Sequence, residues 1–138
     1  MKKSVGVLLI LFLLLPTGCK HLSDSVPPGA FAFTSYDTSG TTVAKGWMSI
    51  TAPDSSTISG EWHFDAIGEP ARIGPQIGDG KLVGGLNGQK IWIELHPEVR
   101  NNNLQLNGVL SGDRLSGQWT WISNEGMANQ GTFQAIRK

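Results

Sequence analysis

From Ala30 onward the chain alternates apolar and polar residues with a period of two, and a triplet of Leu or Ile, any residue, then Gly occurs six times. This period places the aliphatic residue and its glycine on one face of a strand. A face that pairs aliphatic side chains with glycine favours short, sharply bent strands around a narrow core. The triplets are Ile58-Gly60, Leu82-Gly84, Leu86-Gly88, Leu106-Gly108, Leu110-Gly112 and Leu115-Gly117.

The alternation predicts an all-β domain, since no long run has the apolar spacing of a helix. Turns are expected at Asp54-Ser55, Asn87-Gly88 and Gly112-Asp113. Strands joined so tightly are antiparallel neighbours, which predicts an up-and-down meander closed into a barrel of about eight strands, with a two-sheet sandwich as the alternative. The expected strands are 30–36, 42–51, 56–65, 71–77, 81–87, 89–96, 103–111 and 114–122, with a candidate ninth at 130–137.

Residues 1–18 are organised as a secretory signal peptide. Lys2 and Lys3 precede an apolar run over residues 5–15, which is shorter than the ~20 residues of a membrane span. The run ends at LLPTGC, residues 14–19, which contains the only cysteine of the chain. This segment resembles the lipobox of bacterial lipoproteins. The resemblance implies that residues 1–18 are removed and that Cys19 carries the acyl chains, palmitate among them.

A lipidated Cys19 predicts a protein held at the cell envelope, because more than one acyl chain gives stable anchoring to a membrane. Residue 20 is Lys, whereas an aspartate there retains lipoproteins of enteric bacteria at the inner membrane. The resemblance therefore implies the outer membrane if the host is Gram-negative. The polar segment HLSDSVPPG, residues 21–29, predicts a tether. The expected organisation is a signal peptide at 1–18, the lipidated cysteine and tether at 19–29, and the β-barrel domain at 30–138.

The charge of the mature part limits the class of partner. Residues 19–138 carry all 11 Asp and Glu but nine of the 11 Lys and Arg, since Lys2 and Lys3 precede them, for a formal charge of −2. This balance argues against nucleic acid, which is bound by a basic face. With Cys19 assigned to lipid no disulfide forms, so packing alone must stabilise the fold.

A second repeated element, Gly-x-Trp, occurs in ISGEWHF at 58–64 and LSGQWTW at 115–121. Period two places Trp62, Phe64, Trp119 and Trp121 on the inner face. These rings either fill the barrel or line a pocket for one small apolar ligand. The Gly-x-Trp elements and the closing segment Gly131-Thr132-Phe133 resemble, in their general pattern of glycine and aromatic residues, the small meander barrels of the avidin and lipocalin families. The likeness implies a barrel and carries over no ligand-binding residue.

Trp47 and Trp92 are expected on the outer face. An exposed tryptophan there anchors a protein partner or stacks on a sugar ring, or else it lies flat over its cross-strand neighbours. For the expected strand 42–51 an opposite register is also open, with Trp47 inside and Met48 and Ile50 outside.

The outer face of 56–65 presents Glu61, His63 and Asp65, which are residue types of metal and acid/base sites. Their Cα atoms are about 6.6 Å apart along a straight strand, so the side chains converge poorly and a solvated face is expected. The same reasoning applies to strand 89–96, where Trp92, Glu94 and His96 face out while Ile91, Ile93 and Leu95 face in.

Nucleophilic and phosphate-binding motifs are also lacking. No Gly-x-Ser-x-Gly is present, and GPQIGDGKL at 74–82 departs from a phosphate-binding loop in spacing, so it is expected to be a plain loop. We expect no enzymatic activity, no metal site and no cofactor.

Two functions therefore remain open. The first is a non-enzymatic cell-envelope lipoprotein whose barrel binds a small apolar ligand inside, or an envelope protein or glycan on its rim. The alternative is a structural or inhibitory interaction module with a solid core, which acts through loops at 68–80 and 123–130.

The lipid anchor yields a direct test in bacterial cells. Cys19→Ala is expected to abolish incorporation of labelled palmitate and to release the protein from the membrane fraction, because no other thiol is available for acylation. Mass spectrometry of the mature N-terminus identifies the acylated residue. An acylated product from the Cys19→Ala chain would contradict the assignment.

Overall fold

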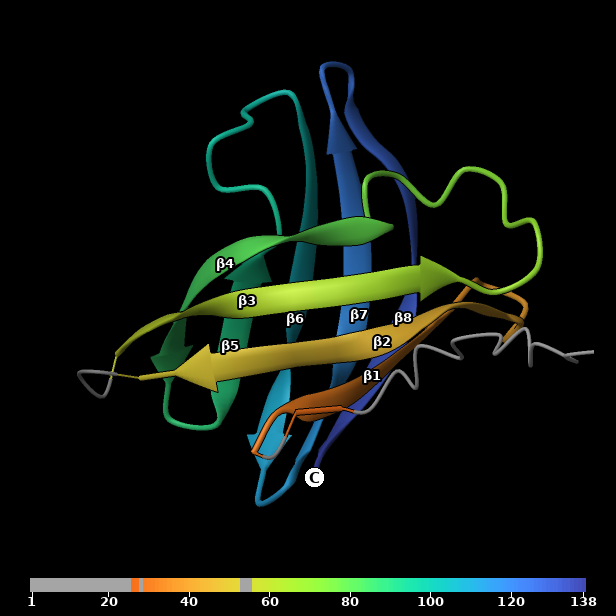
Figure 1. The fold of residues 1–138 in the computed structure, drawn as a ribbon. Coiled ribbons are helices and arrows are strands. Elements are labelled where there is room, and N and C mark those ends of the chain that lie inside the picture. The colour runs from red at the N-terminus through yellow and green to blue at the C-terminus, as the bar shows by residue number, and fades with distance from the viewer. Residues whose placement is uncertain (1–25, 28, 53–55) are drawn as a thin grey trace, which may run out of the picture.

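The structure, a computed structural model, describes residues 26–27, 29–52 and 56–138. They form one closed barrel of eight antiparallel strands in chain order (Figure 1), so the meander barrel is confirmed over the two-sheet sandwich. The described residues contain no helix of the length and apolarity needed to cross a membrane. The strands are β1 (Phe31–Tyr36), β2 (Thr42–Thr51), β3 (Thr57–Ala66), β4 (Gly78–Asn87), β5 (Lys90–Glu94), β6 (Asn102–Ser111), β7 (Arg114–Ser123) and β8 (Gly126–Arg137).

The strand expected at 71–77 is absent, and that prediction was wrong. These residues belong to the loop 67–77 between β3 and β4. Arg72 and Gly74 have φ values of 57° and 67°, a left-handed backbone that interrupts an extended strand. Since one expected strand is missing, the segment 130–137, expected as a ninth strand, belongs to the eighth strand, β8.

Of the two expected hairpin turns within the described residues, the one at Gly112-Asp113 forms where it was expected, and the one expected at Asn87-Gly88 lies one residue later. Gly88 and Gln89 connect β4 to β5, and Gly112 and Asp113 connect β6 to β7. Gly88 and Gly112 have φ values near 60°, which glycine adopts without strain. The turn expected at Asp54-Ser55, the segment expected to be a signal peptide and Cys19 lie outside the described residues.

The connection between β1 and β2 is held by the carboxylate of Asp37. It accepts hydrogen bonds from the hydroxyl of Ser39 at 2.6 Å and from the backbone N–H groups of Ser39 and Thr41 at 2.9 and 3.0 Å. These bonds lower the pKa of the Asp37 carboxyl group, and the bond from the Ser39 hydroxyl has the largest effect. Stability from this turn is therefore present above the ordinary carboxyl pKa and is lost as the pH falls through the lowered value.

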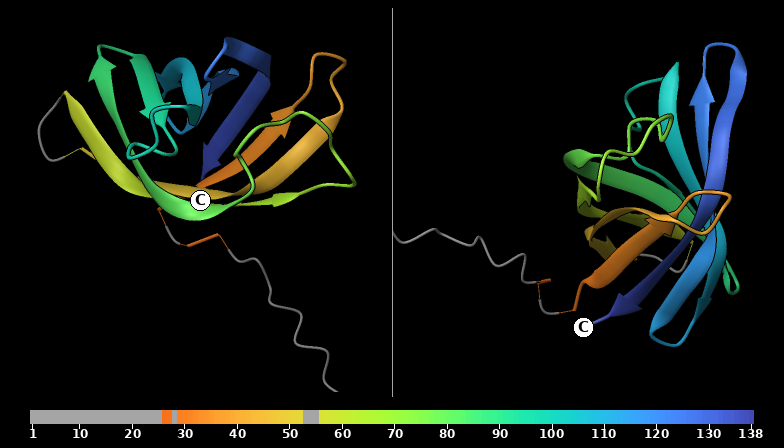
Figure 2. Two further views of the ribbon diagram at one scale, coloured as in Figure 1. Left: turned by 90° about the horizontal axis from the view of Figure 1, so that it is seen from above. Right: turned by 90° about the vertical axis from the view of Figure 1, so that its right-hand side faces the viewer.

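The strands of the two halves run in different directions. β2 and β3 cross the view of Figure 1 from side to side, while β6, β7 and β8 lie close to its vertical, and the two further views show both halves curving around one centre (Figure 2). The barrel closes between β1 and β8, with Phe31 opposite Arg137. The backbone N–H of Gly29 donates to the carbonyl of Lys138 at 2.8 Å, so the start of the domain lies beside the chain end.

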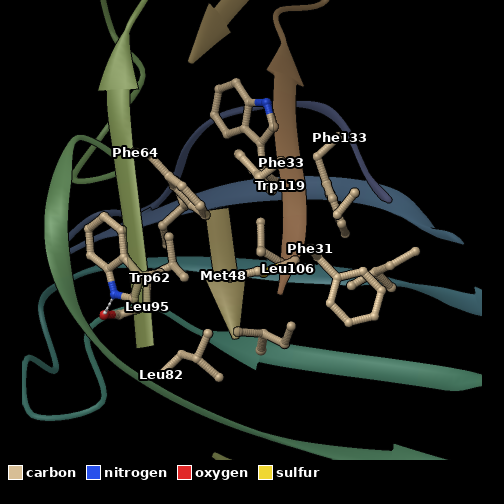
Figure 3. Close-up of a cluster of buried hydrophobic side chains, with 14 of the residues drawn as sticks. Phe31, Phe33, Met48, Trp62, Phe64, Leu82, Leu95, Leu106, Trp119 and Phe133 are labelled. Atoms are coloured by element: carbon tan, nitrogen blue, oxygen red, sulfur yellow. Dashed lines mark hydrogen bonds between the residues drawn. The ribbon is translucent and has the colours of Figure 1, made fainter. Parts of the chain in front are cut away.

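Every strand sends buried side chains to one central cluster (Figure 3), in which no member is more than 3 % exposed. Phe33 and Phe64 stack with ring centroids 3.9 Å apart. The indole N–H of Trp62 donates to the carbonyl of Leu95 at 3.0 Å, so the ring is buried without an unpaired polar atom. One member from each strand in order is Phe31, Met48, Trp62, Leu82, Ile93, Leu106, Trp119 and Phe133.

The glycines of the six triplets allow the strands to bend together. Two of them, Gly88 and Gly112, lie in turns. At each of the other four, an added Cβ would overlap a backbone carbonyl of the neighbouring strand. At Gly117, for example, it would meet the carbonyl oxygen of Asn107 and the Cα of Gly108. These positions therefore admit glycine alone without a shift of the backbone.

Gly117→Ala tests this close approach. We expect a loss of about 3 kcal/mol in the free energy of unfolding, because the methyl group forces two backbones apart. Gly112→Ala is the matched control, since open space surrounds it and only its left-handed φ opposes a side chain, which costs about 1 kcal/mol. Urea unfolding measures both variants. Equal stability of the two would contradict the packing argument.

Candidate functional site

The interior of the barrel is occupied by the rings that were candidates for lining a ligand pocket. Trp62, Phe64 and Trp119 are each at most 1 % exposed. The indole N–H of Trp119 donates to the carbonyl of Tyr36 at 2.8 Å. Rings buried and hydrogen-bonded in this way act as core, so an internal ligand would have to displace them.

Trp121 differs from these three because it lies at one end of the barrel and is half-buried. Its indole N–H donates to the side-chain oxygen of Asn102 at 2.7 Å. The loop 67–77 crosses its ring, since a Cβ added at Gly74 would lie 2.5 Å from Cγ of Trp121. This end of the barrel is therefore covered by the loop.

A buried amide fixes that loop. The hydroxyl of Ser35 donates to Oε1 of Gln76 at 2.8 Å, and Nε2 of Gln76 donates to the carbonyl of Ile73 at 2.7 Å. Both polar side chains are fully buried, and Ile73 is 8 % exposed. Because the loop is tied to β1 and inserts an apolar side chain, it completes the core.

The same loop is tied to β8. The guanidinium of Arg72 donates to the carbonyl of Ala128 at 3.1 Å, and the amide of Asn129 donates to the carbonyl of Arg72 at 2.7 Å. The second loop that we expected, at 123–130, does not form, so that prediction was wrong. β7 runs to Ser123 and β8 begins at Gly126, because a tight hairpin pairs these residues.

Trp47 lies on the outer face of β2. Its neighbour Met48 is fully buried, which excludes the opposite register. The ring of Trp47 stacks with that of its cross-strand partner His63, with centroids 6.4 Å apart. Beside this pair lies a groove of about 340 Å³, lined by side chains that include Lys45 and Asp65.

Of the outward polar residues of β3, His63 and Asp65 contact each other, whereas Glu61 stands apart. Nε2 of His63 lies 3.3 Å from a carboxylate oxygen of Asp65, and Nδ1 lies 3.9 Å from one of Asp79 on β4. These two carboxyl groups are 53 % and 81 % exposed, so each interaction is worth at most about 1 kcal/mol. Glu61 forms no ion pair with the other described residues. The solvated face expected here fits these exposures.

Trp92 is 49 % exposed on the outer face of β5. Its ring lies over Gly85, its partner on β4, since a Cβ added there would lie 2.5 Å from the indole nitrogen. On the other side its partner is Asn107 of β6. A groove of about 360 Å³ is lined by Trp92, Asn107 and Val109 among other residues, and its lining is mostly apolar.

Glu94 and His96, which were expected on the same outer face as Trp92, have different surroundings. Glu94 accepts a hydrogen bond from the amide of Gln105 at 3.4 Å. His96 lies beyond the end of β5, where its ring contacts the carbonyl of Pro75 and packs edge-on against Trp62. The ring of His96 therefore supports the loop 67–77 rather than the outer face.

Sequence reasoning missed Gln76, Asp79 and Asn107. Asp79 meets His63 through the register of β3 and β4, which an 11-residue loop separates in the chain. Gln76 lies where the expected strand 71–77 overlaps the expected loop 74–82. Asn107 did carry a signal, because asparagine is depleted in the middle of strands.

Among residues 26–27, 29–52 and 56–138, no group of three or more His, Cys, Asp or Glu side chains is placed to hold a metal ion. Comparison with models of protein families, with curated proteins and with solved structures finds no match for this chain.

Gln76→Ala tests the attachment of the loop. It leaves the Ser35 hydroxyl and the Ile73 carbonyl without their buried partner, so a loss of about 3 kcal/mol in unfolding free energy is expected. Amide hydrogen exchange over residues 72–78 should accelerate. Gln89→Ala, in an exposed turn, is the control and should change stability by less than about 0.5 kcal/mol. A Gln76→Ala protein as stable as this control would contradict the role of the amide.

Proposed function

We propose that this protein is a non-enzymatic, lipid-anchored component of the bacterial cell envelope that binds an envelope partner on the outside of its barrel. The anchor is Cys19, supported by the lipobox resemblance of LLPTGC. The barrel then acts as a recognition module held at the membrane surface.

The observation that carries this proposal is the contrast between the two faces of the barrel. Inside, the clustered side chains are at most 3 % exposed and the open end is covered by the loop 67–77. Outside, Trp47 and Trp92 each border a groove of more than 300 Å³. The parts of these two rings that remain exposed are aromatic surface that a partner could cover.

A second candidate function is an interaction module that acts through the loop 67–77. Ile67 and Ile77 are the first and last residues of this loop, and each is 41 % exposed. Since the loop is tied to β1 and β8, it presents these apolar side chains at fixed positions, as a preorganised binding loop does.

Photo-crosslinking in living cells distinguishes these surfaces. A benzoylphenylalanine residue replaces Trp47, Trp92 or Ile77 in the full chain, and a fourth chain carries it at Asp113 in the β6–β7 turn as the control. We expect crosslinked products from position 47 or 92 that are at least about tenfold more abundant than from the control, since a stable interface excludes water around its anchors.

Products from position 77 alone would favour the loop module. Control-level products at all three positions would contradict external binding. Saturable binding of palmitate that shifts the fluorescence of the buried tryptophans would instead support an internal ligand.

A further inference from the structure

We propose that the outer face of β6, β7 and β8 binds an uncharged glycan chain, with Trp92 of β5 as the stacking surface at its edge. These strands lie side by side in one half of the barrel (Figure 1). Two neighbouring cross-strand rows make up what we call the neutral face. Its residues are Asn107, Gln118 and Thr132 in one row and Gln105, Thr120 and Gln130 in the other.

The charges of the outer surface are distributed unevenly. The outward positions of β2, β3 and β4 include Lys45, Glu61, Asp65, Asp79 and Lys81. The neutral face contains no ionisable side chain, although outer surfaces usually carry charged residues at about a quarter to a third of their positions. These six positions therefore present uncharged polar groups, which suit a partner without charge, and they are bordered by Glu94 of β5, which accepts a hydrogen bond from Gln105.

The neutral face also offers unused hydrogen-bonding groups. The side chains of Asn107, Gln118 and Thr132 form no hydrogen bond to another described residue. Two amides and a hydroxyl supply both donors and acceptors along one row. Sugar hydroxyls need both, because each one donates and accepts.

Trp92 begins this row, since it pairs with Asn107, which in turn pairs with Gln118. One face of its ring is packed over Gly85 and the residue remains 49 % exposed. The ring is thus held in place before binding, which reduces the entropy lost when a partner stacks on it. On the same face of β5, Trp92 lies between Lys90 and Glu94, whose charges have opposite sign.

The chemistry of this surface fits a glycan better than other partners. The C–H face of a pyranose stacks on an aromatic ring, while its hydroxyls bind neighbouring amides. A nucleic acid or an anionic lipid surface would require basic residues, which the neutral face lacks. A protein interface would surround its aromatic anchor with apolar residues on several sides. Here Val109 lies beside Trp92, but the row that continues from Trp92 is polar, with Asn107, Gln118 and Thr132.

This inference rests on the proposed function, because it names the chemical class of the external partner. The test uses the purified full chain in detergent, with calorimetric titration of chitohexaose and cellohexaose as uncharged probes and oligogalacturonate as an acidic probe. We expect an uncharged oligosaccharide to bind and the acidic one to bind at least about tenfold more weakly.

Variants locate the site. Trp92→Ala and Asn107→Ala should each weaken binding of the uncharged probe by about tenfold or more, as expected for a central contact. Gly85→Ala should also weaken it, since the added methyl group moves the ring of Trp92 while leaving the indole present. Met127→Ala is the control, because that side chain is 61 % exposed outside the neutral face, and it should change the affinity less than twofold. Thermal unfolding checks that each variant is folded.

Failure of both uncharged probes to bind at millimolar concentration would overturn this inference, as would binding that a folded Asn107→Ala chain retains unchanged. A protein crosslinked at position 92, together with no glycan binding, would overturn the glycan assignment and leave the proposed function standing. Control-level crosslinking at every position would instead remove the proposed function itself.

Discussion

The close approach of neighbouring backbones at glycine is the constraint on which the rest of the barrel depends. Gly108 and Gly117 face each other on β6 and β7, and a Cβ on either would overlap the carbonyl of the opposite strand. Gly60 and Gly84 permit the same approach between β2 and β3 and between β4 and β5. Strands that bend this tightly enclose a narrow interior, which apolar side chains from eight strands then fill.

The alternation of apolar and polar residues was enough to predict the meander barrel. It could not predict which residues of different strands contact each other. Alternation gave the face of each residue, so the burial of Trp119 follows from its position alone. The residue that its ring covers does not follow from the alternation: the ring packs over Gly131 on β8. Such pairings depend on register, and the loop 67–77 depends on one buried amide of Gln76. A polar residue in a glycine-rich segment carries no periodic signal, so the loop was mistaken for a strand.

A filled interior changes which surfaces are available for binding. The avidin and lipocalin likeness had implied a barrel and left a pocket open as one of two alternatives. With the rings of Trp62 and Trp119 committed to the core, the exposed indole of Trp92 and the half-buried one of Trp47 become the principal aromatic groups for a partner. Their surroundings differ: the groove beside Trp47 includes Lys45 and Asp65, whereas Trp92 lies between Lys90 and Glu94 on β5 and adjoins the uncharged Asn107 of β6. The barrel therefore presents two chemically distinct outer surfaces.

The central claim is that the inner face is core and that binding takes place outside. Diffraction from crystals of the protein under xenon pressure tests it most directly, because xenon enters dry apolar cavities that other probes miss. The account predicts no xenon within the cluster around Met48, Leu106 and Trp119. A well-occupied xenon atom beside Trp119 would reveal an internal cavity and would contradict the account.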